Sequence, residues 1–302
     1  MTQHVWTGVF PAVTTQFRQD LSLDLDATAR HWEALIASGV SGLVVAGSLG
    51  ENQTLDPAEK RLLVAEAVRV AAGRLPVLSG VAEMGAAAAC QYVRDCERLG
   101  AGGFMVMPAM VYKADSREAL SHFRRVAAAT SLPWMLYNNP VGYPVDITPA
   151  ELEQLADIPN LVAIKESSAN PRRITELRLA VGDRFSVFVG VDDLILESAI
   201  LGIDGWVAGS GIAFPAENQT FWNLTLAGRW AEARELYRWF YPLLKLDTHV
   251  KFVQYIKLAV QEVGLGAEWV REPRLPLVGD ERERVLSIIR HGIATRPRLG
   301  GG

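Results

Sequence analysis

The sequence of 302 residues lacks the features that mark several large classes of protein. Its two cysteines, Cys90 and Cys96, are too few for a disulfide framework, so a reducing, cytoplasmic setting is expected. The net charge of -4 and the pI near 5.8 do not fit a basic nucleic-acid-binding surface. No apolar run approaches the roughly 18 residues of a membrane span, and the first ten residues lack a signal-peptide pattern. We therefore expect neither a nucleic-acid partner nor a membrane partner.

Patterns that bind metals or dinucleotides are also missing. The five histidines are scattered, with no two at ligand spacing, and no GxGxxG follows the first apolar run. Two adjacent acids, Asp192 and Asp193, could bind a cation, but such a pair more often caps a helix N-terminus. We expect no metal site, and no Ser-His-Asp or Cys-His arrangement suggests itself.

Short apolar runs, each followed by an amphipathic segment, are what the sequence does contain. These runs are mostly continuous rather than alternating, as expected of strands that are covered on both faces. They span residues 8–14, 42–47, 76–81, 102–108, 134–139, 161–166, 185–190 and 205–210. Helix starts follow some of them, with Asp56 before Pro57 and Thr148 before Pro149.

Eight such units predict an α/β fold, specifically a (β/α)8 TIM barrel, with a doubly wound sheet as the alternative. The later part of the chain reads as consecutive helices. We therefore expect a barrel over residues 1–228 and a C-terminal helical extension, packed on the barrel, over residues 229–302. An aromatic cluster in this extension would either pack its helices or form an interaction surface. Its members are Trp230, Tyr237, Trp239, Phe240 and Tyr241.

The ends of the predicted strands are the places to look for chemistry, because active sites of such barrels lie there. Lys165 ends the sixth run, where burial would favour a neutral amine that attacks carbonyls; the alternative is a rim lysine paired with Glu166 or another acid. Tyr137 ends the fifth run and would either shuttle protons or bury its ring with a solvated hydroxyl. The loop over residues 47–52 would either hold an anion on its backbone amides or be a simple turn.

Three motifs together carry a resemblance to a known family. They are GSLGE after the second run, YNNP after the fifth and VAIKES in the sixth. In this order they resemble the dihydrodipicolinate synthase / N-acetylneuraminate lyase superfamily of class I aldolase-type barrels, over essentially the whole chain. The resemblance implies that Lys165 forms a Schiff base with a 2-oxo acid and that Tyr137 relays protons. It also implies that Ser48 and Leu49 bind the substrate carboxylate and that Val207 lines the site. For the whole protein it implies a homotetramer, built as a dimer of dimers, that needs no metal or organic cofactor.

The sequence departs from the synthase pattern at three places. Leu49 lacks the hydroxyl of the second threonine that the synthase usually has, and the neuraminate lyases normally keep a hydroxyl there too. Pro108-Ala109-Met110 stands where the synthase has a tyrosine pair, one of which reaches the neighbouring subunit's site, unless a shift brings Tyr112 there. Val141-Gly142-Tyr143 lacks the arginine for the second substrate's carboxylate. These departures argue against a dihydrodipicolinate synthase.

Another branch fits these departures. The stretches TGVFPAVTTQF, SLGENQTL and RWFYPLLKLD resemble the 1-pyrroline-4-hydroxy-2-carboxylate deaminases of hydroxyproline catabolism. That resemblance implies a lyase that releases ammonia and 2-oxoglutarate semialdehyde. A 2-keto-3-deoxy sugar acid dehydratase or aldolase is the alternative, in which Asn139, Tyr143 and Ser167 would be polar groups at the mouth. An inactive barrel that senses a 2-oxo acid should lack Lys165 or Tyr137, yet both are present.

Overall fold

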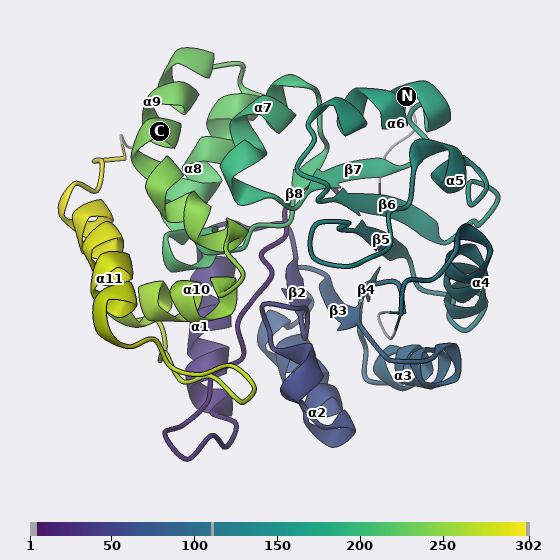
Figure 1. The fold of residues 1–302 in the computed structure, drawn as a ribbon, viewed down its shortest axis with the longest axis horizontal. Coiled ribbons are helices and arrows are strands. Elements are labelled where there is room, and N and C mark those ends of the chain that lie inside the picture. Colours follow the sequence, from purple (N-terminus) through teal and green to yellow (C-terminus); the bar gives the residue numbers. More distant parts are fainter. Residues whose placement is uncertain (1–4, 110–111, 300–302) are drawn as a thin grey trace.

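The computed structural model describes residues 5–109 and 112–299, and eight parallel strands form its sheet (Figure 1). Each strand lies inside one of the eight predicted runs, although most are shorter than predicted. The strands are β1 Gly8–Val9, β2 Leu43–Val45, β3 Val77–Val81, β4 Gly103–Val106, β5 Trp134–Asn138, β6 Leu161–Glu166, β7 Ser186–Val189 and β8 Gly205–Trp206. Nearly every strand residue is buried, which explains why the runs are continuously apolar.

The strand order shows how the sheet curls. Neighbours follow the order β1-β8-β7-β6-β5-β4-β3-β2. The two edge strands also meet, because the Val13 amide donates to the Val44 carbonyl over 3.0 Å and the Val44 amide donates to the Pro11 carbonyl over 2.9 Å. This arrangement is consistent with the predicted (β/α)8 barrel, and it places the ends of all eight strands around one mouth.

Helices cover the outside of the sheet (Figure 1). They are α1 Leu25–Ala37, α2 Pro57–Ala71, α3 Ala86–Arg98, α4 Ser116–Ala127, α5 Pro149–Glu153, α6 Arg172–Val181, α7 Ile195–Ile200 and α8 Pro215–Leu226, with short 3-10 turns η1 Asn52–Thr54, η2 Asp192–Leu194 and η3 Ser210–Ala213. The predicted helix starts at Asp56 and Thr148 are confirmed, since each side chain accepts from backbone amides of the first turn and forms a capping box.

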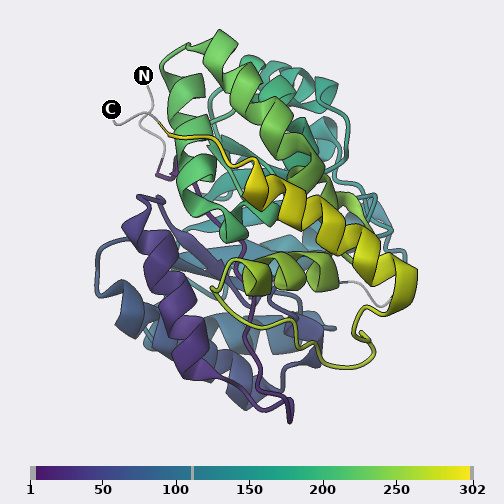
Figure 2. The same ribbon diagram turned by 90° about the vertical axis from the view of Figure 1, so that its left-hand side faces the viewer.

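Consecutive helices follow the last strand, as the sequence predicts. They are α9 Trp230–Leu244, η4 Lys245–Thr248, α10 Phe252–Glu262 and α11 Gly279–Ala294. These helices gather on the side of the molecule that carries α1 and α8, away from α3 and α4 (Figure 1), and α11 runs across α10 and α9 (Figure 2). Where a domain boundary falls between the barrel and these helices stays a prediction.

Two aromatic residues of α9, Trp239 and Phe240, pack against Phe214. Phe240 is fully buried, and its ring and that of Trp239 meet Phe214 edge-on at 6.1 and 5.7 Å between centroids. These two residues therefore favour packing over an external interaction surface. No helix in residues 5–109 and 112–299 is long and apolar enough to cross a membrane.

Candidate active site

Lys165 lies at the C-terminal end of β6, beside Tyr137 of β5 in the register of the sheet. Its side chain is only 6% exposed, and its Nζ atom lies 4.0 Å from the centroid of the Tyr137 ring. The adjacent acid, Glu166, instead accepts from the Ser168 amide over 2.6 Å and from Asn138 Nδ2 over 3.1 Å. The alternative of a rim lysine paired with Glu166 is therefore wrong.

The surroundings of Lys165 favour its neutral form. A methyl group added to Gly190 would lie 2.0 Å from Lys165 Cε, so the lysine packs directly against the backbone at the end of β7. Burial lowers the pKa of Lys165, and the negative charges of Asp247, Tyr143 and Asp192 act in the opposite direction. The result is an amine that loses its proton more readily than an exposed lysine.

Tyr137 forms one wall beside this amine. Its hydroxyl accepts from Asn139 Nδ2 over 3.0 Å, and burial raises the pKa of the phenol to about 12. Its ring meets that of Tyr143 edge-on, with 5.7 Å between the centroids. The Tyr143 hydroxyl in turn contacts Ser48 Oγ, and burial raises the pKa of Tyr143 as well. Ser48, Tyr143 and Tyr137 thus form a row of hydroxyl groups at the mouth.

The sequence pointed to Tyr143 only as a polar group of the mouth. Its position could not be read from the letters, because residues 139–148 contain no regular helix or strand to fix the direction of a side chain. Sequence reasoning therefore missed its contact with Ser48. A tyrosine spaced a few residues after a strand end is the only signal that the sequence offers.

The loop from Gly47 to Asn52 contains backbone amides that are available to bind a ligand. Among the described residues, neither the Ser48 amide nor the Leu49 amide donates to a protein acceptor. The loop is held from below, because Thr15 Oγ1 donates to the Gly50 carbonyl over 2.8 Å. It is thus a fixed turn with two free backbone donors, the arrangement that binds carboxylates.

A buried ion pair fixes the end of the same loop. Lys257 Nζ of α10 lies 2.9 Å from Glu51 Oε1, and both side chains are 0% exposed. Lys257 also donates to the Thr15 carbonyl over 2.9 Å, while Glu51 Oε2 accepts from the Arg271 amide over 3.1 Å. The helices after the barrel therefore hold the loop that carries Ser48 and Leu49.

The other predicted residues lie around β7 and β8. Val207 is buried directly after β8 and donates its amide to the Val189 carbonyl over 2.9 Å. Asp192 does not cap the helical turn of its own segment: its carboxylate instead accepts from Trp206 Nε1 over 2.9 Å and from the amide of Ser210, the first residue of η3, over 2.6 Å. Burial raises the pKa of Asp192 to about 6.

The structure does not place Met110 or Tyr112, two further positions named from the sequence, in the site. Met110 lies outside the described residues, and Tyr112 is 55% exposed. Whether Tyr112 enters a neighbouring subunit's site stays a prediction. No group of three or more His, Cys, Asp or Glu side chains able to hold a metal ion occurs in the part of the chain that the structure describes.

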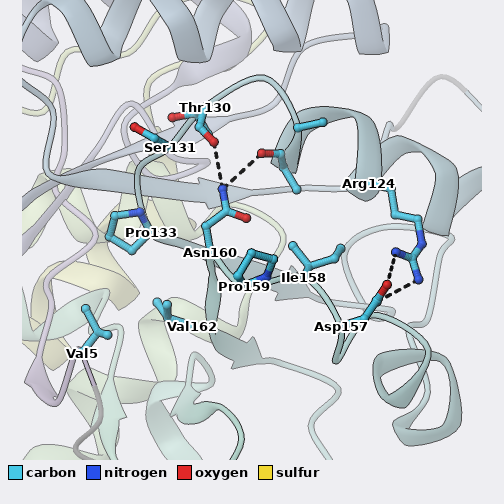
Figure 3. A pocket seen from close by; sticks show the side chains of 12 residues that line it. Val5, Arg124, Thr130, Ser131, Pro133, Asp157, Ile158, Pro159, Asn160 and Val162 are labelled. Carbon is cyan, nitrogen blue, oxygen red and sulfur yellow. Dashed lines mark hydrogen bonds and ion pairs between the residues drawn. The ribbon is translucent and has the colours of Figure 1, made fainter.

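A large surface hollow of about 820 Å³ lies at the other end of β6 (Figure 3). Asn160 and Val162 line it, far down the strand from Lys165. Its polar side chains already have partners: Arg124 pairs with Asp157 at 2.9 Å, and Asn160 donates to the Thr130 carbonyl over 2.9 Å. Since parallel barrels place their chemistry at the opposite, C-terminal face, this hollow is not the candidate active site.

The residues at the mouth can carry out one kind of chemistry together. A neutral amine attacks the carbonyl or imine carbon of a substrate and forms a Schiff base. Free backbone amides hold a carboxylate next to that carbon, and hydroxyl groups move protons to and from it.

Comparisons with known proteins identify the family of this chain. A sequence model of the Dihydrodipicolinate synthetase family matches residues 5–292. The chain is 34% identical to the 4-hydroxy-tetrahydrodipicolinate synthase of Exiguobacterium sibiricum, covering 91% of this chain and 92% of that protein. It is also 34% identical to that of Sorangium cellulosum, covering 98% and 99%.

Solved structures lead to the same family. A dihydrodipicolinate synthase from Bacillus anthracis superposes with a TM-score of 0.91 at 28% identity, covering 98% of this chain and 100% of the other. A prophage protein of the dihydrodipicolinic acid synthase family from E. coli K12, solved in complex with pyruvate, superposes with a TM-score of 0.89 at 27% identity, covering 96% and 99%. The chain described here belongs to the dihydrodipicolinate synthetase family.

Proposed function

We propose that this protein is a lysine Schiff-base lyase that acts on a 2-oxo acid or a cyclic imino acid. The observation that carries the proposal is the position of Lys165, buried at the end of β6 with its amine 4.0 Å from the Tyr137 ring centroid. Among the described residues, Lys165 has no ion-pair partner that would keep it charged. A buried amine of this kind is a nucleophile rather than a structural cation.

Within this class we favour 1-pyrroline-4-hydroxy-2-carboxylate as the substrate. It has a single carboxylate next to an imine carbon, which matches the free amides of Ser48 and Leu49. The segment Val141-Gly142-Tyr143 supplies no arginine for a second carboxylate, and this reaction needs none. Tyr143 instead reaches Ser48 at the mouth.

The reaction follows from these positions. Lys165 attacks carbon 2, and transimination opens the ring to give a Schiff base with a free amine on carbon 5. Tyr137 removes a proton from carbon 3, with Tyr143 and Ser48 next to it to pass that proton on. The resulting enamine expels the hydroxyl of carbon 4 as water. The carbon 5 amine becomes an enamine and then an imine, which hydrolyses to ammonia and an aldehyde, and hydrolysis at Lys165 frees 2-oxoglutarate semialdehyde.

The synthase reaction is the second candidate, because the curated relatives are named 4-hydroxy-tetrahydrodipicolinate synthase. These names support the synthase more directly than they support any deaminase. The residues of this site support it less, since Leu49 has no hydroxyl and no arginine follows the YNNP motif. Dehydration or cleavage of a 2-keto-3-deoxy sugar acid is a further alternative that would use the same lysine.

A product panel separates these reactions. Purified protein is given 1-pyrroline-4-hydroxy-2-carboxylate, the synthase substrates, and a 2-keto-3-deoxy sugar acid, each with a Lys165→Ala variant as the control. The proposal predicts ammonia and 2-oxoglutarate semialdehyde from the first substrate, and only with intact Lys165. Formation of 4-hydroxy-tetrahydrodipicolinate, or release of pyruvate from the sugar acid without any ammonia from the first substrate, would overturn the favoured substrate.

The remaining features of the proposal concern the whole protein. We propose a cytoplasmic homotetramer, built as a dimer of dimers, that works without a metal or organic cofactor. Measurement of the molar mass in solution by light scattering tests the tetramer. Activity that survives dialysis against a chelator, and that needs no added cofactor, tests the rest.

A further inference from the structure

A second carboxyl group reaches the barrel mouth from outside the barrel. Asp247 belongs to η4, which continues α9. A methyl group added to Gly209 would lie 2.3 Å from Asp247 Oδ1 and 3.4 Å from Asp192 Oδ2, so the Asp247 carboxyl lies against the backbone just after β8. Only a glycine at position 209 leaves room for it. The carboxyl therefore lies in the segment that follows β8.

The two acids at this place differ in their partners. Asp192 is saturated, with donors from Trp206, Gly209 and Ser210. In the part of the chain that the structure describes, no protein group donates a hydrogen bond to the Asp247 carboxyl. Asp192 therefore holds the loop after β8, while Asp247 has its hydrogen-bonding capacity left for a bound molecule.

Asp247 also acts on the groups proposed to do the chemistry. Among the nearby charges, that of Asp247 has the largest effect on the pKa of Lys165, which it raises. It also raises the pKa of Tyr137. Burial, with the nearby charges of Asp192 and Asp193, raises the pKa of Asp247 well above its usual range, while the Lys165 ammonium opposes this. The pKa of Lys165 is lowered in turn, so the two groups favour a neutral amine beside a protonated acid. A carboxyl group that keeps its proton can donate it.

We propose that Asp247 is the general acid that protonates the departing hydroxyl on carbon 4 of the substrate. This inference rests on the proposed function, because only a substrate with a leaving hydroxyl next to the enamine needs such an acid. Hydroxide is a poor leaving group, and proton donation in the transition state converts it into water.

Loss of water from the bound enamine uses the proton of Asp247. The nitrogen lone pair of the Lys165 enamine re-forms the C=N bond, the carbon 2–carbon 3 double bond shifts to carbons 3 and 4, and the carbon 4–oxygen bond breaks. The oxygen leaves with that electron pair and takes the proton of Asp247, giving water. The step thus creates an iminium cation and a carboxylate anion together, and their attraction stabilises the transition state.

The test compares Asp247→Asn with the wild type and with Asp280→Asn, an exposed aspartate of α11. Three rates are measured: borohydride trapping of pyruvate on Lys165, exchange of the pyruvate methyl protons with deuterium, and ammonia release from 1-pyrroline-4-hydroxy-2-carboxylate. Trapping and exchange need no leaving group, so in Asp247→Asn both should stay within about threefold of wild type, while ammonia release falls by roughly 10²–10⁴-fold. Asp280→Asn should match wild type in all three.

A second substrate makes the test specific for acid catalysis. In the 4-chloro analogue of the same imino acid, chloride departs without a proton. The defect of Asp247→Asn should therefore shrink to within about tenfold of wild type, whereas a merely misshapen site would be equally poor with both leaving groups. Partial rescue of this kind is the signature of a missing proton donor.

The outcomes separate the two proposals. A wild-type protein that releases no ammonia refutes the proposed substrate and with it the leaving group assigned to Asp247. An active wild type with an equally active Asp247→Asn refutes the acid role alone. A variant that loses trapping and exchange as severely as ammonia release also refutes it, since Asp247 would then act through Lys165.

Discussion

The buried pair of Lys257 and Glu51 gives the sharpest stability prediction. The two side chains are 0% exposed and lie 2.9 Å apart. Lys257→Met keeps most of the side-chain volume but leaves the Glu51 carboxylate buried without its cation. Breaking a buried pair by removing one partner costs about 3–5 kcal/mol, a large share of the roughly 5–15 kcal/mol that stabilises a typical protein.

The assay is equilibrium unfolding in urea, followed by the fluorescence of the eight tryptophans. The matched control is Lys251→Met, which removes the partner of Glu281 from a pair whose lysine is 44% exposed. Exposed pairs are worth about 0–1 kcal/mol. We therefore expect a large fall in the free energy of unfolding for Lys257→Met and almost none for Lys251→Met.

A double variant tests the physical reason. Glu51→Gln combined with Lys257→Met removes the unpaired charge, so it should be more stable than Lys257→Met alone. Because the pair holds the loop of Ser48 and Leu49, Lys257→Met should also bind pyruvate more weakly. Equal loss of stability in the two single methionine variants, or a double variant worse than Lys257→Met, would refute this reasoning.

Three other predictions concern the site itself. In Gly190→Ala the added methyl would lie 2.0 Å from Lys165 Cε, so Schiff-base trapping should slow at least tenfold while the fold is retained. Gly85→Ala, whose methyl would meet nothing within 4 Å, should trap at the wild-type rate. Equal trapping rates in the two variants would contradict the packing of Lys165 against Gly190. Tyr143→Phe, which removes the contact with Ser48, should lower kcat roughly 10²-fold in steady-state assays while trapping persists; an unchanged kcat would exclude the hydroxyl row. Because burial lowers the pKa of Lys165, the trapping rate should rise with pH and level off below the ordinary lysine value of about 10.4; a rise that continues beyond it would contradict a buried amine.

The eight strands could be predicted because burial on both faces leaves a continuous apolar run in the sequence. Their lengths could not. The first run was predicted over residues 8–14, yet β1 ends at Val9. Pro11 has no amide to donate, and the contact with β2 is a single bridge between Ala12 and Val44, although the Phe10 and Ala12 amides still donate to the Trp206 and Ala208 carbonyls over 2.8 Å.

The choice between two roles for Lys165 needed the structure. Side chains that follow one another on a strand point to opposite faces, so Glu166 cannot easily reach its neighbour Lys165 and turns to Asn138 and Ser168 instead. That argument becomes available from the sequence only once the strand is known to continue through both residues, as β6 does.

The positions of the two acids at the mouth, Asp192 and Asp247, could not be predicted from the sequence for a different reason. The adjacent acids Asp192 and Asp193 were expected to cap a helix N-terminus, as such pairs often do, but the partners of Asp192 come from β8 and from the turn that follows it. Asp247 is the last residue of the stretch RWFYPLLKLD, but that resemblance assigned it no role. Its place at the mouth depends on how α9 and η4 dock on the barrel, and helical periodicity does not specify a docking position.

Borohydride reduction in the presence of pyruvate, followed by mass mapping of the peptides, tests whether Lys165 forms the Schiff base. We expect one covalent adduct, on the peptide that contains Lys165, and none in Lys165→Ala. A protein that traps no 2-oxo acid, or an adduct on another buried lysine such as Lys257, would contradict it.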